Sequence, residues 1–127
     1  MKKNVPMPAL FILIICVLMG CHHRGRHGLD VNVSESGSTY RLQAWYNRNK
    51  TGEVVRYINR QIQPSSLFSS ADDYFDVHTQ LSDRTRFYIK SSPGRIIISI
   101  NKRENSPGSY EKIKRMCGGV VEIVKGN

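Results

Sequence analysis

Cysteine and histidine are the residues of this chain whose chemistry could support catalysis. Cys117 and His78 could in principle pair as a nucleophile and its general base. Cys117, however, falls on the apolar phase of the segment around it, where a buried structural thiol is expected. His78 lies on the polar phase of a segment that alternates like a strand. The motifs G-x-S-x-G, H-E-x-x-H, C-x-x-C and a phosphate-binding glycine loop are absent. We therefore expect no enzymatic activity.

Two further clusters contain residue types that bind cations. Residues 22–28 hold three histidines among arginine and glycine, but no Cys, Asp or Glu lies between them. Asp72, Asp73 and Asp76 lack the regular ligand alternation and the turn glycine of a calcium loop. The sequence therefore predicts neither a metal site nor a cofactor.

The amino-terminal segment has the features of an export signal. Lys2 and Lys3 precede an apolar run from Ala9 to Met19. As a helix this run would extend roughly 16 Å, about half of a hydrocarbon core of ~30 Å. A positive start, a short apolar run and the small Gly20 are typical of a secretory signal rather than of a membrane span.

Leu18, Met19, Gly20 and Cys21 resemble the lipobox of bacterial lipoproteins, in which an apolar residue stands three positions before a cysteine and a small one directly before it. Met19 is bulkier than the residue usual at its position. The resemblance implies cleavage between Gly20 and Cys21, diacylglyceration of the Cys21 thiol and acylation of the new amino group. Such chains, at ~0.8 kcal/mol per buried CH₂, would make attachment effectively permanent. The alternative is an ordinary signal with an accidental cysteine.

Cleavage would leave 107 residues, enough for one domain. Because Lys2 and Lys3 leave with the signal, the mature chain has 17 basic and 10 acidic residues, and the net charge falls from +9 to +7. Cys16 also leaves and Cys21 carries lipid, so Cys117 has no partner for an intramolecular disulfide.

We do not expect nucleic acid as a partner, because an exported basic chain meets other anions. The accessible anions are lipid head groups, lipopolysaccharide phosphates, peptidoglycan carboxylates and acidic protein surfaces. The alternative is that the positive charge is spread over the surface of the domain and serves its solubility. Residues 21–28 are predicted to form a flexible basic tether lying against head groups. Among enteric-type lipoproteins an Asp directly after the acylated cysteine favours the inner membrane, so His22 favours the outer membrane; the inner membrane stays open.

The remaining residues, 29–127, are expected to form a single small α+β domain. Apolar residues alternate over 29–33 and 40–46 around a turn at 35–38, which predicts a pair of strands. Alternation returns over 75–81, 87–89 and 96–100, with a loop over 65–73 and a hairpin at Pro93 and Gly94. The run 96–98 has apolar residues on both faces, as in a central strand.

Two helices are predicted between these strands. Capping side chains at 49–51 precede Val54, Val55, Ile58 and Ile62 at helical spacing, and Pro64 ends that helix. The second is predicted from Ser109 to Cys117, followed by a short strand over 120–124. Two glycines at 118 and 119 would cost a helix interior ~2 kcal/mol. The apolar spacing through residue 124 also fits one continuous helix, which is the alternative.

Arg56 and Arg60 lie four residues apart on the polar face of the first helix. Like charges at this spacing cost a few tenths of a kcal/mol, so the pair does not serve helix stability. It is a candidate contact for an anion or a partner, or else a solvated face. The aromatic residues could also include interface anchors, although most are expected in the core: Trp45, Tyr46, Tyr57, Tyr74, Phe75 and Tyr110.

The predicted fold is an antiparallel sheet with two helices on one face, similar to the ferredoxin-like pattern with one or more extra strands. Such a likeness implies no function. We expect a lipid-anchored envelope protein with a non-catalytic periplasmic binding domain, an accessory in envelope stress or assembly. In size and layout it is similar to small uncharacterised enterobacterial lipoproteins, including prophage-encoded ones. The alternatives are a pilot or assembly factor of a secretion or conjugation apparatus and, less favoured, a cell-wall or lipid hydrolase.

Overall fold

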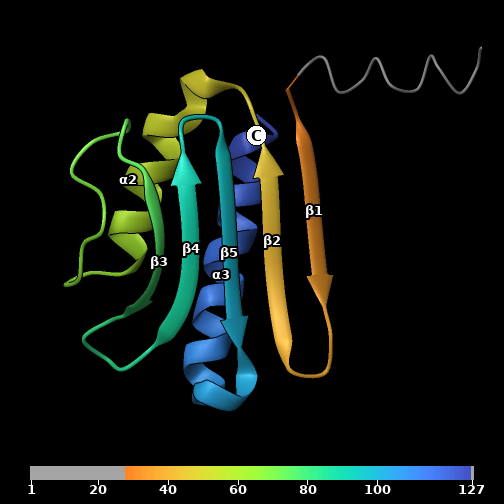
Figure 1. Ribbon diagram of the computed structural model, residues 1–127, viewed down its shortest axis with the longest axis vertical. Helices are drawn as coiled ribbons and strands as arrows, with labels where there is room; N and C mark the ends of the chain where they lie inside the picture. Colours follow the sequence, from red (N-terminus) through yellow and green to blue (C-terminus); the bar gives the residue numbers. More distant parts are fainter. Residues whose placement is uncertain (1–27, 127) are drawn as a thin grey trace, which may run out of the picture.

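A five-stranded antiparallel sheet with both helices on one face makes up the computed structural model, which describes residues 28–126 (Figure 1). The elements are β1 (Asp30–Glu35), β2 (Thr39–Trp45), α2 (Thr51–Gln61), β3 (Phe75–Gln80), β4 (Arg86–Ser92), β5 (Arg95–Asn101) and α3 (Pro107–Val124). The strand order is β1-β2-β5-β4-β3, and all four pairings are antiparallel. The predicted α+β class, an antiparallel sheet with two helices on one face, is confirmed.

The chain builds this sheet as a hairpin, a helix, a three-strand meander and a second helix. β5, the predicted central strand, lies between β2 and β4, so that Ile98 is the register partner of both Leu42 and Ile89. The predicted β4–β5 hairpin turns at Gly94, whose φ of +81° suits glycine. Gly94 N–H donates to Thr51 Oγ1, which ties this turn to the start of α2.

The core lies between the sheet and the helices. Alternate residues of β2, β4 and β5 face the helices, because successive side chains of a strand point to opposite faces. The buried apolar residues that fill this layer are Tyr40, Leu42, Ala44, Val54, Val55, Ile58, Ile62, Phe87, Ile89, Ile96, Ile98, Ile100, Tyr110, Ile113, Met116, Cys117, Val120 and Val124. Burial of each large aliphatic side chain contributes about 1.5–3 kcal/mol. The buried residues include Val54, Val55, Ile58 and Ile62, which form the predicted apolar face of α2.

The helix predicted from Ser109 to Cys117 is present, but the strand predicted over 120–124 was wrong. α3 starts two residues earlier than expected, with Ser106 Oγ accepting from Ser109 N–H, and continues without interruption through Val124 in place of the predicted strand. Cys117, Val120 and Val124 extend one buried helical face, and burying them offsets the low helix propensity of the two glycines.

The two glycines of α3 have different surroundings. A Cβ on Gly118 would meet no atom within 4 Å, because this position faces solvent. A Cβ on Gly119 would overlap with the Tyr57 ring and hydroxyl, which pack there from α2. Gly119 therefore allows the two helices to approach, whereas Gly118 has no packing role.

Alanine substitutions should separate these roles. We expect Gly118→Ala to raise the free energy of unfolding by up to ~1 kcal/mol, through helix propensity alone. Gly119→Ala should lower it by roughly 1–3 kcal/mol, because the Tyr57 ring must leave its position. Urea unfolding measures both. Repeating Gly119→Ala in a Tyr57→Ala background should remove the penalty; a penalty that persists there would contradict the assigned contact.

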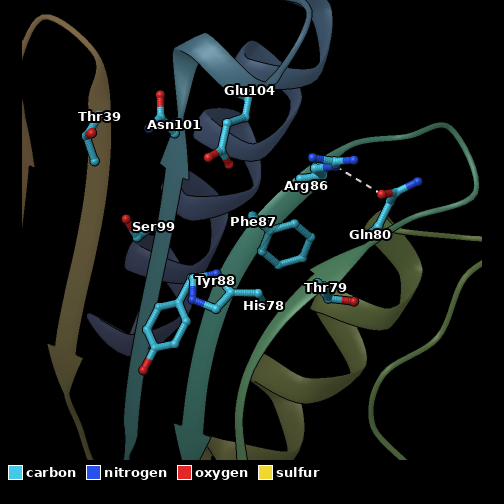
Figure 2. A pocket seen from close by; sticks show the side chains of 10 residues that line it. All are labelled: Thr39, His78, Thr79, Gln80, Arg86, Phe87, Tyr88, Ser99, Asn101 and Glu104. Carbon is cyan, nitrogen blue, oxygen red and sulfur yellow. Dashed lines mark hydrogen bonds between the residues drawn. The ribbon is translucent and has the colours of Figure 1, made fainter.

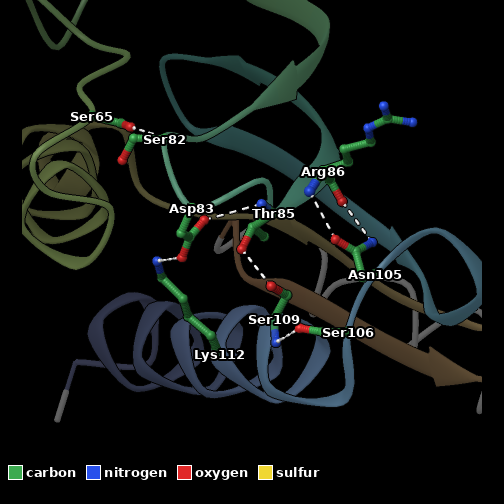
Figure 3. A network of polar contacts seen from close by, with 9 residues as sticks. All are labelled: Ser65, Ser82, Asp83, Thr85, Arg86, Asn105, Ser106, Ser109 and Lys112. Carbon is green, nitrogen blue, oxygen red and sulfur yellow. Dashed lines mark hydrogen bonds and ion pairs between the residues drawn. The ribbon is translucent and has the colours of Figure 1, made fainter.

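A polar network fastens the β3–β4 turn to the first turns of α3 (Figure 3). Lys112 Nζ lies 2.8 Å from Asp83 Oδ2, while Asp83 Oδ1 accepts from Thr85 N–H. The buried Thr85 hydroxyl donates to Ser109 Oγ at 2.8 Å. The hydrogen bonds from Lys112 and Thr85 lower the pKa of Asp83 to about 2. This carboxylate therefore stabilises the fold in its ionised form.

The network predicts a specific pH dependence of stability. Because folding lowers the pKa of Asp83, its contribution is complete above the unfolded pKa of about 3.9 and is lost as pH falls toward 2. The pair is partly exposed, so we expect Asp83→Asn to cost no more than about 1 kcal/mol at pH 7. Chemical unfolding at several pH values measures the difference between the two proteins. A difference that stayed constant from pH 7 to pH 2 would contradict this role.

Candidate binding face

The two residues that could have formed a catalytic pair lie on opposite sides of the sheet. Cys117 is buried in the core between α3 and the sheet, and burial raises the pKa of its thiol to about 12. His78 is exposed on β3, on the face away from the helices, with its ring 5.0 Å from that of Tyr88. The sheet separates them, so Cys117 and His78 form no nucleophile–base pair. Cys117 is a core thiol, as predicted.

The other residues singled out in the sequence fall elsewhere. The lipobox residues 18–21 and the tether through residue 27 lie outside the described residues. Arg56 and Arg60 are exposed on α2, on the helical side of the molecule, and the Arg60 guanidinium lies 5.9 Å from the centre of the Tyr57 ring. Within residues 28–126 neither arginine forms an ion pair.

The side of the sheet that neither α2 nor α3 covers presents a second set of side chains, which we call the open face. Each of its residues alternates along its strand with residues that face the helices. The open face comprises Asn32 of β1, Arg41, Gln43 and Trp45 of β2, Arg95, Ile97 and Ser99 of β5, Tyr88 and Lys90 of β4, and Asp76 and His78 of β3. It is thus a mixed polar, cationic and aromatic surface on a rigid sheet.

Ile97 occupies the centre of the open face. It belongs to the middle strand and has Gln43 and Lys90 as its register partners on either side. Only 4% of its surface is exposed, although no helix lies over it. Neighbouring long side chains of the open face must supply this cover, since their aliphatic stems can lie along an apolar surface. The open face is therefore packed at its centre.

Trp45 and Arg95 form a stacked pair on this face. They are register partners, and the Arg95 guanidinium carbon lies 4.3 Å from the centre of the indole ring, a cation–π contact. Trp45 is nevertheless 43% exposed. The Nε atom of Arg95 is buried and has no hydrogen-bond partner within residues 28–126. The stack orients a guanidinium whose donors are not used by the described part of the chain.

Arg41, Lys90 and Arg95 make the centre of the open face cationic. They come from β2, β4 and β5, the middle strand and its two neighbours. Both ion pairs among the described residues involve lysines of α3 instead. Asp76, the register partner of Lys90, accepts a hydrogen bond from the Tyr88 hydroxyl at 2.7 Å. That bond raises the pKa of Tyr88, against the positive charges of Arg41 and Arg95.

Shallow hollows flank this centre. One of about 470 Å³ lies toward the end of the sheet where β5 runs into α3 (Figure 2), within the range of small-ligand sites. It is lined by Thr39, His78, Thr79, Gln80, Arg86, Phe87, Tyr88, Ser99, Asn101 and Glu104. A second, of about 280 Å³, lies between Lys90, Arg95 and Tyr74, whose side chain is 77% exposed. A third, of about 70 Å³, adjoins Trp45, Gln43 and Asn32.

Sequence reasoning did not identify the open face as a site. The polar phase of β2 was visible in the alternation, and Trp45 and Tyr74 were among the aromatic residues considered as anchors. Both are exposed, whereas Tyr46 and Tyr110 are buried. The missing information was which phase of each strand the helices would cover.

Comparison of the chain with protein-family models, curated proteins and solved structures found no match. Across residues 28–126, no three His, Cys, Asp or Glu side chains come together as metal ligands. In the same part of the chain no helix has the length and apolar character needed to cross a membrane.

The burial of Cys117 predicts low thiol reactivity. In a chain with Cys16→Ser and Cys21→Ser, only Cys117 is left to react. Because the thiolate is the reactive form and the pKa is about 12, a chromogenic disulfide reagent at pH 8 should not modify the folded protein on the minute scale. Addition of denaturant should give one thiol per chain within seconds. Rapid modification without denaturant would show that Cys117 is accessible.

Proposed function

We propose that this chain is a lipid-anchored protein of the bacterial cell envelope whose domain faces the periplasm and binds an envelope component without catalysis. The observation that carries the binding role is the open face, a sheet surface whose three cations form no ion pair with any described residue and one of which, Arg95, is stacked on an exposed tryptophan. The residues that support the anchor are Leu18, Met19, Gly20 and Cys21, through their resemblance to a lipobox.

The open face is a better candidate surface than the polar side of α2. Arg56 and Arg60 extend from a single helix, and the only aromatic contact of the pair is the long one of 5.9 Å between the Arg60 guanidinium and the centre of the Tyr57 ring, among the described residues. Arg95, in contrast, lies closer to its aromatic partner, 4.3 Å from the centre of the Trp45 ring, and its buried Nε has no hydrogen-bond partner among the described residues. Because an oriented side chain loses less entropy on binding, such a group favours recognition.

The proposed anchor would keep this domain close to a membrane. β1 begins at Asp30, and the eight residues between it and Cys21 can span at most about 29 Å. Lipid attachment at Cys21 would therefore restrict the domain to partners in the membrane surface or in the adjacent layer. A tether of this length suits an accessory that holds one component near the membrane.

Metabolic labelling with a radioactive fatty acid tests the anchor. We expect label in the wild-type chain and none in Cys21→Ser, because this substitution removes the thiol that would be acylated. Separation of inner and outer membranes should place the labelled protein in the outer membrane, as His22 predicts. Cys117→Ser is the matched control and should keep its label. A wild-type chain that stays unlabelled and is recovered free in the periplasm would refute the anchor.

A further inference from the structure

We propose that the open face binds peptidoglycan, the cell-wall polymer in which a glycan strand carries short peptides with free carboxylates. The inference rests on the proposed envelope location and names the ligand of the same face. A sugar ring would lie against the exposed indole of Trp45, and the peptide carboxylates would pair with Arg41, Lys90 and Arg95.

The arrangement of the three cations favours a ligand whose negative charges are single and spaced apart over a ligand with one compact anionic group. Arg41 and Lys90 stand on the two strands that flank β5, two strand spacings apart and offset by two residues along β5, which corresponds to a backbone separation of roughly 12 Å. Each can therefore pair with a separate carboxylate along an extended chain, and a guanidinium can do so with two parallel hydrogen bonds. A single phosphate would need converging donors such as a helix N-terminus or a nest of backbone N–H groups. At the centre of the face β5 pairs on both sides, so its backbone groups are used by the sheet.

The rest of the face suits a sugar chain better than a protein. Protein interfaces have an apolar centre, but here the central aliphatic residue, Ile97, is almost fully covered. The hollows on either side present the amide and hydroxyl groups of Asn32, Gln43, Ser99 and Asn101, which can exchange hydrogen bonds with sugar hydroxyls. Trp45 adds a flat apolar surface beside them.

Attraction to a lipid surface does not explain this face. Basic residues also occupy the helical side, including Arg56, Arg60 and Arg115, so a charged membrane would not select one side of the domain. Trp45 also lies against Arg95 rather than extending alone toward a bilayer. The stacked, hydrogen-bonding character of the face therefore favours a polar ligand.

The chain provides its own probe, because Trp45 is its single tryptophan. The full chain in a non-ionic detergent is titrated with soluble peptidoglycan fragments, which keep their peptides, released from cell-wall sacculi by a muramidase. We expect saturable change in Trp45 fluorescence that weakens at high salt. Chitin oligosaccharides of equal glycan length, which lack the peptides and their carboxylates, should bind at least tenfold more weakly, a difference of about 1.4 kcal/mol.

Two matched double variants locate the site. Arg41→Gln with Lys90→Gln removes two charges from the open face and leaves the Trp45–Arg95 stack intact. Arg56→Gln with Arg60→Gln removes two charges from α2. Thermal unfolding confirms that both are folded, as expected for exposed or half-exposed side chains. The first pair should weaken binding by tenfold or more and the second by less than twofold.

Three outcomes would overturn the proposal: no binding of the acidic fragments at physiological salt, equal weakening by both variant pairs, or tighter binding of poly-glutamate or of anionic lipid vesicles than of the fragments. Each is independent of the anchor. A chain that is labelled at Cys21 but does not bind peptidoglycan refutes this inference alone, whereas an unlabelled chain that binds it refutes only the anchor.

Discussion

The burial of one face of the sheet beneath two helices is the constraint on which the rest of the structure depends. Ile96, Ile98 and Ile100 of the central strand are buried in one cluster with the apolar residues of both helices. The domain has no disulfide among its described residues, so this layer must supply most of the stabilising free energy. The close approach of the helices at Gly119 and Tyr57 completes it. Because α2 and α3 both lie on one side, neither of them covers the other side of the sheet (Figure 1).

Polar contacts at the two margins of the sheet add to this core. Glu35, at the end of the edge strand β1, accepts from the Tyr110 hydroxyl at 2.9 Å and pairs with Lys114 at 3.0 Å. Asp83 and Lys112 connect the turn beside the other edge strand to the same helix. Exposed pairs of this kind contribute little free energy, but they restrict how the edges move relative to α3. Both margins of the sheet are therefore held by one helix.

A sheet held in this way can present side chains in fixed positions. On the open face the alternation of each strand sets the direction of the side chains, and cross-strand neighbours such as Trp45 and Arg95 restrict one another. Preorganisation reduces the entropy lost on binding, so even a polar and shallow surface can recognise a ligand. A preorganised but shallow binding surface suits a protein whose proposed anchor already restricts it to one compartment.

Much of the fold was predictable from the sequence, because local patterns determined it. The alternation in β2, the spacing in α2 and the Pro93–Gly94 turn each depend on neighbouring residues, and all three predictions are confirmed. The lipobox prediction also depends on four adjacent residues, and it stays a prediction. Only the tertiary structure decided that α3 continues through Gly118 and Gly119, since the compensating contacts come from α2 and the sheet. It also decided which phase of each strand stays uncovered. The open face brings together residues of all five strands, and no single stretch of sequence contains that information.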